Sequence, residues 1–163
     1  MSPASSTLTY LFTDVEGSTS QWETATDMSE RGEHHFAILR ECVVAGGGEI
    51  FATMGDGIGA AFASTRAAVD AAVAAQIAMP ATGLRVRMGL HTGESQRVGD
   101  DFRGRALNRA ARIMSSGHGR QILVSDVTAT LLRTGPTPAA LLDLGVHALR
   151  DLAEPEHVWQ VLD

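Results

Sequence analysis

The sequence has 163 residues, 44% of them hydrophobic, which is enough for one sizeable core and too short for two comfortable domains. The net charge of −6 and the pI near 5.4 exclude a broad basic surface for duplex nucleic acid, and the single cysteine, Cys42, excludes an intrachain disulfide. Because no run approaches the roughly 18 apolar residues of a membrane span and no secretion signal is present, we expect one cytoplasmic domain over residues 1–163 without membrane contact.

The first 48 residues predict a strand followed by a helical layer. Residues 7–12 form an apolar, β-favouring run that ends at Asp14, so Asp14 is placed at the C-terminal end of a strand. Gly17-Ser18-Thr19 then opens a helical stretch with a hydroxyl cap. The apolar residues of this stretch recur at approximately helical spacing, with a break near residues 24–27, until Gly46-Gly47-Gly48; they are Trp22, Met28, Phe36, Leu39 and Val43.

The middle of the chain predicts a hairpin and a second helix. Residues 49–54 and 58–62 read as strands, and Gly55-Asp56-Gly57 between them places Asp56 at the hairpin tip. Residues 66–79 form an alanine-rich helix with Val69, Val73 and Ile77 on one face, and Pro80 follows as a terminator. The small side chains of this helix favour close packing on a sheet.

The remaining segments complete an α+β pattern. Residues 84–90, 121–124 and 158–162 read as strands, residues 104–116 as a helix and residues 126–133 as a short helix. The order β-α-β-β-α-β predicts a ferredoxin-like, palm-type sheet with helices packed mainly on one face. The six histidines show no metal-ligand spacing, and His91 lies at a strand end.

Asp14 and Asp56 are candidate metal ligands. If the first strand pairs with the hairpin, both carboxylates lie at one edge of the sheet, where they could bind Mg²⁺ or Mn²⁺ through oxygen. An Asp-Gly turn alone is chiefly a hairpin signal, so the prediction rests on the combination of the two residues. All thirteen basic residues are arginines, so a Walker-A lysine and a Schiff-base lysine are excluded. The planar guanidinium group of arginine can donate two parallel hydrogen bonds to phosphate oxygens.

The helix over residues 104–116 is the second candidate element. Its buried stripe is predicted to be Leu107, Ala110, Ala111 and Met114, which leaves Arg105, Asn108 and Arg112 on another face. An amide and a guanidinium one turn apart can reach a reacting phosphate. A solvated arginine face is the alternative interpretation of this helix alone.

Taken in order, these motifs resemble the class III nucleotide cyclase catalytic domain. The resemblance covers residues 9–161 and rests on Phe12-Thr13-Asp14-Val15-Glu16-Gly17-Ser18-Thr19, Thr53-Met54-Gly55-Asp56-Gly57, Gly89-Leu90-His91-Thr92-Gly93-Glu94 and Gly104-Arg105-Ala106-Leu107-Asn108-Arg109-Ala110-Ala111-Arg112. It is closest to the bacterial form that is often the N-terminal domain of a larger transcriptional regulator, so additional regulatory domains are consistent with it.

The resemblance implies a homodimer in which each active site draws on both chains and binds ATP, or GTP, with two Mg²⁺ or Mn²⁺ ions. Asp14 and Asp56 match the metal aspartates, and Asn108 and Arg112 match the pair that orients the nucleotide and stabilises the transition state. Asp101 matches one base-reading position, and Arg150 falls near a phosphate-binding lysine of the family.

Ala52 departs from the family, because adenylate cyclases of this class usually carry a base-reading lysine there. A lost hydrogen bond from a charged group costs roughly 1.5–3 kcal/mol, which predicts a weak or poorly selective adenylate cyclase. A non-catalytic nucleotide-binding or dimerisation module of a regulator is the alternative. A diguanylate cyclase ranks last, since its Gly-Gly-Asp/Glu-Glu-Phe signature is missing.

Overall fold

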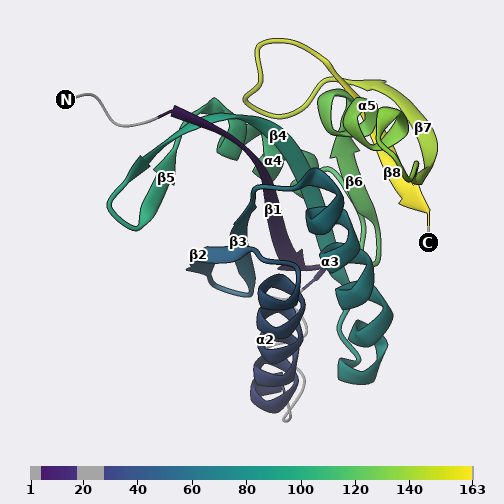
Figure 1. Ribbon diagram of the computed structural model, residues 1–163. Helices are drawn as coiled ribbons and strands as arrows, with labels where there is room; N and C mark the ends of the chain where they lie inside the picture. Colours follow the sequence, from purple (N-terminus) through teal and green to yellow (C-terminus); the bar gives the residue numbers. More distant parts are fainter. Residues whose placement is uncertain (1–4, 18–27, 163) are drawn as a thin grey trace.

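The protein is built on one eight-stranded mixed sheet. The computed structural model describes residues 5–17 and 28–162, and the predicted helix start at residues 18–27 lies outside them. The strand order is β2-β3-β1-β4-β6-β8-β7, with β5 paired to β4 (Figure 1). The elements are β1 (Ser5–Val15), α2 (Met28–Ala45), β2 (Glu49–Met54), β3 (Gly57–Phe62), α3 (Thr65–Ala78), the 3₁₀ helix η1 (Met79–Thr82), β4 (Val86–Val98), β5 (Asp101–Arg103), α4 (Arg105–Ser115), β6 (Ile122–Ser125), α5 (Asp126–Thr134), β7 (Ala140–His147) and β8 (Glu156–Leu162).

The predicted ferredoxin-like, α+β fold is confirmed. β1 lies between β3 and β4 and is antiparallel to both, and β2 completes the hairpin at the edge of the sheet. β6 pairs with β4 in parallel, and the β8–β7 ribbon extends the sheet further. β5 and β7 were not anticipated, because β5 has three residues and a register shift between Asp143 and Val146 interrupts the alternation of β7.

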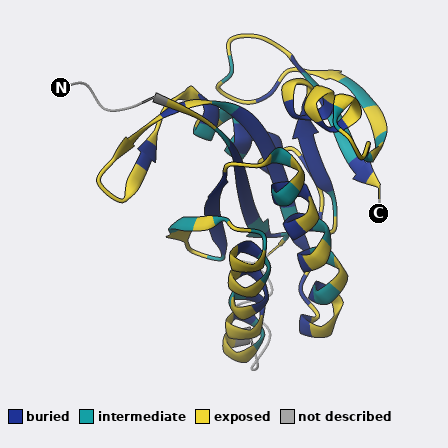
Figure 2. Cartoon of the chain, in the orientation of Figure 1, coloured by how far each residue is buried: buried dark blue, intermediate teal, exposed yellow. Residues whose placement is uncertain are grey.

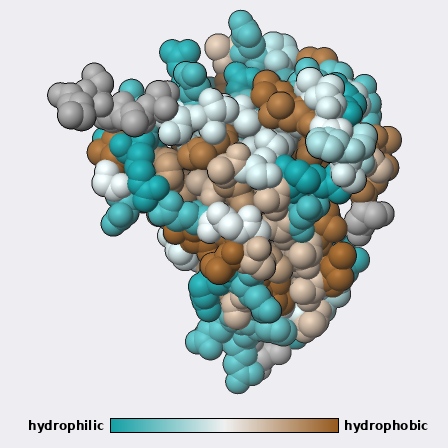
Figure 3. Space-filling view, in the orientation of Figure 1, coloured by the Kyte–Doolittle hydropathy of each residue, from teal (hydrophilic) through white to brown (hydrophobic). Residues whose placement is uncertain are grey.

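One face of the sheet is covered by α2, α3 and α5 (Figure 1). In α3 the prediction for Ile77 was wrong: this side chain is 67% exposed, and Val73 is half-buried. Small side chains let the α3 backbone lie close to its neighbours, so the helix buries a face made mostly of alanine. Its outer face keeps apolar side chains, whereas the outer face of α2 is hydrophilic (Figure 3). The buried residues of α3 are Ala68, Val69, Ala71, Ala72 and Ala75.

The opposite face carries α4, which packs on Tyr10 and Phe12 of β1. Two residues of the predicted buried stripe, Ala110 and Met114, are buried, and the other two, Leu107 and Ala111, are half-buried. The helix also buries Ala106 and Ile113, which were not in the predicted stripe. Helix and strand approach closely here, since a Cβ at Gly89 of β4 would lie 2.4 Å from the Met114 backbone nitrogen. Burial is therefore most complete along the central strands (Figure 2).

A chain of buried hydroxyl groups joins the centre of the sheet to α5 and His91. Its hydrogen bonds run between the hydroxyls of Thr9 and Thr92 at 2.9 Å and of Thr92 and Thr128 at 2.9 Å. The Ser125 hydroxyl lies 3.1 Å from that of Thr128 and 2.6 Å from His91 Nδ1. His91 is therefore a structural histidine, as its sequence context suggested.

His91 is expected to make the fold sensitive to acid. Burial, aided by the nearby charge of Arg109, lowers the pKa of His91 to about 4 from an ordinary value of 6.5. As the pH falls from 6.5 towards 4, His91 binds a proton in the unfolded chain but not in the folded chain. The free energy of unfolding should therefore fall by roughly 3 kcal/mol at most. Urea unfolding at pH 7 and pH 4.5 should show this loss in the wild type and a smaller one in His91→Asn, whereas parallel losses in both proteins would contradict the assignment.

Candidate active site

Asp14 is paired with one arginine, Arg87, at the end of β1. Asp14 is opposite Arg87 in the antiparallel register, and Arg87 Nε donates to Asp14 Oδ1 at 2.6 Å while Nη2 contacts Oδ2. The Asp14 carboxylate, and with smaller effect the charge of Asp56, raise the pKa of Arg87. The structure therefore brings the two predicted metal ligands into one electrostatic neighbourhood.

The hairpin tip that carries Asp56 is pressed against the backbone of β1. A Cβ at Gly57 would lie 1.8 Å from the Thr13 carbonyl oxygen and 3.3 Å from the Asp14 Cα, so only glycine fits this place. The Ile58 backbone N–H also donates to Thr13 Oγ1 at 3.2 Å. Glycine at position 57 thus sets the distance between the hairpin tip and the end of β1.

Arg87 is a functional candidate that the sequence reasoning missed. Its Nη1 donates to the Ser115 carbonyl at 3.0 Å, so this side chain joins Asp14 to the C-terminal end of α4. The available signal was that Arg85 and Arg87 alternate with apolar residues in the run of residues 84–90. The partner of Arg87 lies 73 residues earlier in the sequence, and only the strand pairing reveals it.

The donor set of this site fits a hard divalent cation. Two carboxylates from adjacent backbone segments offer oxygen ligands, which Mg²⁺ and Mn²⁺ prefer. Within the described residues there is no group of three or more His, Cys, Asp or Glu side chains that could enclose a metal. The remaining ligands would therefore come from backbone, water or a polyphosphate substrate, as is usual for Mg²⁺.

The second half of the predicted site lies on α4. Asn108 is exposed, and Arg112 in the last turn forms an ion pair with Asp151, with 2.7 Å between Nη2 and Oδ2. Within the described residues, 5–17 and 28–162, neither Asn108 nor Arg112 forms a hydrogen bond or ion pair with the two aspartates, Asp14 and Asp56. In a single chain the two halves of the predicted site therefore make no direct polar contact, and Arg87 links Asp14 only to the backbone at the end of α4.

The two predicted base-reading positions, Ala52 and Asp101, lie on neighbouring segments. Phe51 and Phe102, adjacent to them in sequence, have ring centroids 5.3 Å apart with an edge-to-face geometry. This aromatic cluster packs against α4, the helix that carries Asn108. Asp101 is exposed, and its Oδ1 accepts a hydrogen bond from the Phe102 backbone N–H at 2.8 Å.

Arg150 is exposed and precedes Asp151 in the turn between β7 and β8. The predicted phosphate-binding residue and the partner of Arg112 are thus consecutive in the chain. The turn places both of them near the C-terminal end of α4.

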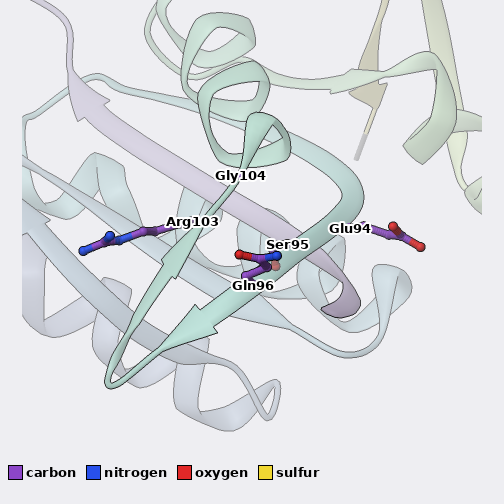
Figure 4. A pocket seen from close by; sticks show the side chains of 5 residues that line it. All are labelled: Glu94, Ser95, Gln96, Arg103 and Gly104. Atoms are coloured by element: carbon purple, nitrogen blue, oxygen red, sulfur yellow. The ribbon is translucent and has the colours of Figure 1, made fainter. Parts of the chain in front are cut away.

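A separate pocket lies where β5 leads into α4 (Figure 4). Glu94, at its border, pairs with Thr7, seven residues before Asp14, so the pocket lies roughly 20 Å along the strands from the carboxylate pair. The Ser95 hydroxyl is in contact with the Tyr10 hydroxyl. This pocket is not part of the metal site; its lining residues are Glu94, Ser95, Gln96, Arg103 and Gly104.

Comparison with known proteins gives a consistent picture. Residues 1–144 match the family model described as the adenylate and guanylate cyclase catalytic domain. The chain is 38% identical over 165 residues to the uncharacterised protein Rv0891c of Mycobacterium tuberculosis, covering 98% of this chain and 57% of that protein. It is 28% identical to the receptor-type adenylate cyclase GRESAG 4.2 of Trypanosoma brucei brucei, covering 94% of this chain and 36% of that protein.

The fold is likewise similar to solved structures. The adenylyl cyclase CyaB of P. aeruginosa superposes with a TM-score of 0.89 at 23% identity, covering 100% of this chain and 97% of that one. In the part of the chain that the structure describes, no helix is both long and apolar enough to cross a membrane. The present chain spans little more than half the length of the mycobacterial relative that it matches.

Proposed function

This chain belongs to the adenylate and guanylate cyclase catalytic domain family, and we propose that it converts ATP to 3′,5′-cyclic AMP and pyrophosphate. The observation that carries the proposal is the close packing of the Asp56 hairpin tip, through Gly57, against the end of β1 that carries Asp14. Residues 1–163 would act as one catalytic domain, and regulatory domains can accompany it in a longer protein.

In this proposal Asp14 and Asp56 hold two Mg²⁺ or Mn²⁺ ions. When bound, these ions would polarise the ribose 3′-hydroxyl and neutralise charge on the triphosphate. The 3′-oxygen forms a bond to the α-phosphorus, the bond from that phosphorus to the β-bridging oxygen breaks, pyrophosphate leaves, and the hydroxyl proton passes to solvent. Positioning and charge stabilisation dominate the catalysis of such transfers.

Nucleotide binding and transition-state stabilisation are assigned to α4 and the segments near it. Asn108 would orient the nucleotide, and Arg112 would stabilise the charge that develops on the transferring phosphate. Arg150 would bind the phosphates from the neighbouring turn. Asp101 would read the base, and the Ala52 methyl group offers no donor beside it, so we expect weak discrimination between ATP and GTP.

The active form is proposed to be a symmetric homodimer. Because Asn108 and Arg112 make no direct polar contact with Asp14 or Asp56 within the described residues of one chain, a second copy can supply Asn108 and Arg112 to the metal half of its partner. Two equivalent sites then arise from one two-fold arrangement.

The proposal is tested by incubating the purified chain with Mn²⁺ and either ATP or GTP at a concentration that ensures dimerisation. Chromatography should detect a cyclic nucleotide and pyrophosphate, with a modest preference for ATP. Absence of cyclic product from both nucleotides would remove the enzymatic interpretation.

A second function is favoured by two specific observations, the Ala52 substitution and the pairing of both Asp14 oxygens with Arg87. It is a catalytically inactive nucleotide-binding or dimerisation module of a signalling protein. Its signature would be nucleotide-dependent thermal stabilisation without pyrophosphate release.

A further inference from the structure

Arg112 is held in a position that leaves part of its hydrogen-bonding capacity unused. The side chain is 32% exposed and donates through Nη2 to Asp151 Oδ2 at 2.7 Å. Its Nε, in contrast, is buried and has no partner among the described residues. Because a buried donor without an acceptor is unfavourable, a ligand that accepted hydrogen bonds from several guanidinium nitrogens would improve on this arrangement.

Asp151 occupies a backbone conformation that suits glycine better than aspartate. Its φ of 64° lies in the left-handed region, in a turn closed by the Leu152 N–H donating to the Leu149 carbonyl at 3.2 Å. Strained non-glycine residues that persist are candidates for a functional role. Here the residue places a carboxylate directly on Arg112.

The turn that carries Asp151 is anchored, so its carboxylate is presented at a fixed place. Leu149 is buried against Ile113, the residue after Arg112, and Leu152 packs on the same cluster. The Asp151 side chain itself is 59% exposed, and exposed ion pairs contribute little to stability. The ion pair is therefore well placed but weak enough for a multiply charged anion to displace.

We propose that Asp151 is an internal competitor of the substrate: it occupies the Arg112 guanidinium until a polyphosphate displaces it, and so sets the affinity for the triphosphate. The inference rests on the proposed function in assigning Arg112 to the phosphates. Asp151 lowers affinity without taking part in the chemical step.

The decisive variant is Asp151→Asn, which keeps the shape of the side chain, tolerates a left-handed backbone and removes the charge. We expect the Kd for inorganic tripolyphosphate, measured by calorimetry, and the KM for Mn²⁺–ATP to fall about fivefold. The kcat should change by less than twofold, and the melting temperature should not fall. Asp151→Gly, which fits the backbone without strain, should give the same gain.

Two controls separate this role from others. Glu154→Gln removes an exposed carboxylate from the same loop and should leave the tripolyphosphate affinity unchanged, so an equal gain there would indicate a general charge effect and overturn the proposal. In an Arg112→Ala background the gain from Asp151→Asn should vanish. A fall in kcat at constant KM would instead make Asp151 a positioning residue, and an unchanged tripolyphosphate Kd would also refute the proposal.

The calorimetric measurement also distinguishes this inference from the proposed function. If the wild type forms no cyclic nucleotide but Asp151→Asn still tightens tripolyphosphate binding through Arg112, the cyclase proposal fails and the inference stands. If turnover is present and the tripolyphosphate affinity does not respond, the inference fails and the cyclase proposal stands.

Discussion

Replacing Asp14 by asparagine is expected to lower cyclase activity at least about a hundredfold. The change keeps the size of the side chain and an acceptor for Arg87 Nε but removes the negative charge that would bind the cation. Because cation binding supplies several kcal/mol of charge stabilisation to phosphoryl transfer, the loss should fall mainly on turnover and on Mn²⁺ affinity. Cyclic nucleotide formation and Mn²⁺ binding are the measurements.

Asp70→Asn is the matched control for this variant. Asp70 lies on α3 and forms an exposed ion pair with Arg66 one helical turn away, with 3.0 Å between Nε and Oδ1. Its replacement should leave the activity within about twofold of the wild type, because exposed pairs of this kind contribute little. If Asp14→Asn retained activity close to that of Asp70→Asn, with both variants folded by circular dichroism, the metal assignment of Asp14 would have to be abandoned.

Replacing Gly57 by alanine is expected to damage stability and activity together. The new Cβ would lie 1.8 Å from the Thr13 carbonyl oxygen, so the hairpin tip must move away from β1 and take Asp56 with it. Overpacking of this kind typically costs about 1–3 kcal/mol of unfolding free energy, and a clash with rigid backbone places the expected cost at the upper end of that range. Urea unfolding should report the lost stability, and the Mn²⁺–nucleotide assay should report lost turnover in the protein that remains folded.

Gly55→Ala tests the same turn without the clash. Gly55 has a φ of 56°, and nothing lies within 4 Å of the position that its Cβ would take. The cost should therefore be the backbone penalty alone, about 1–2 kcal/mol. Equal destabilisation by the two substitutions would show that close packing on Thr13 does not hold the hairpin tip in place.

The β2–β3 hairpin and α3 show how far local sequence patterns predict this fold. β2 and β3 follow the predicted ranges closely, because Gly55-Asp56-Gly57 marks a turn between two short β-favouring runs. α3 was placed within one residue at each end, but its buried face was misjudged at Ile77. The prediction placed the larger apolar side chains in the core because of their hydrophobicity. In the structure the close approach of the helix backbone leaves room mainly for alanine on the buried face.

The predicted site was only partly accessible to sequence reasoning. Asp14 and Asp56 could be singled out because Asp14 lies near the end of the first strand and Asp56 lies in the Gly55-Asp56-Gly57 turn, and their shared edge follows from antiparallel pairing. The metal-binding role of Asp14 and Asp56 stays a prediction. The same holds for the roles assigned to the other site residues, which are Asn108, Arg112, Asp101, Ala52 and Arg150. Neither Arg87 nor Asp151 was identified, since each is defined by its partner and not by a local pattern.

The amino-acid sequence by itself determined the order of the central strands and helices and the positions of the carboxylates, because periodicity and turn chemistry act over a few residues. Only the tertiary structure decided that Arg87 neutralises Asp14 and that Asp151 occupies Arg112. These ion pairs join residues 73 and 39 positions apart (87 − 14 and 151 − 112). The physical reason is that a charged side chain pairs with whatever partner the packed sheet and its loops bring within about 4 Å, and that partner is fixed by the fold as a whole.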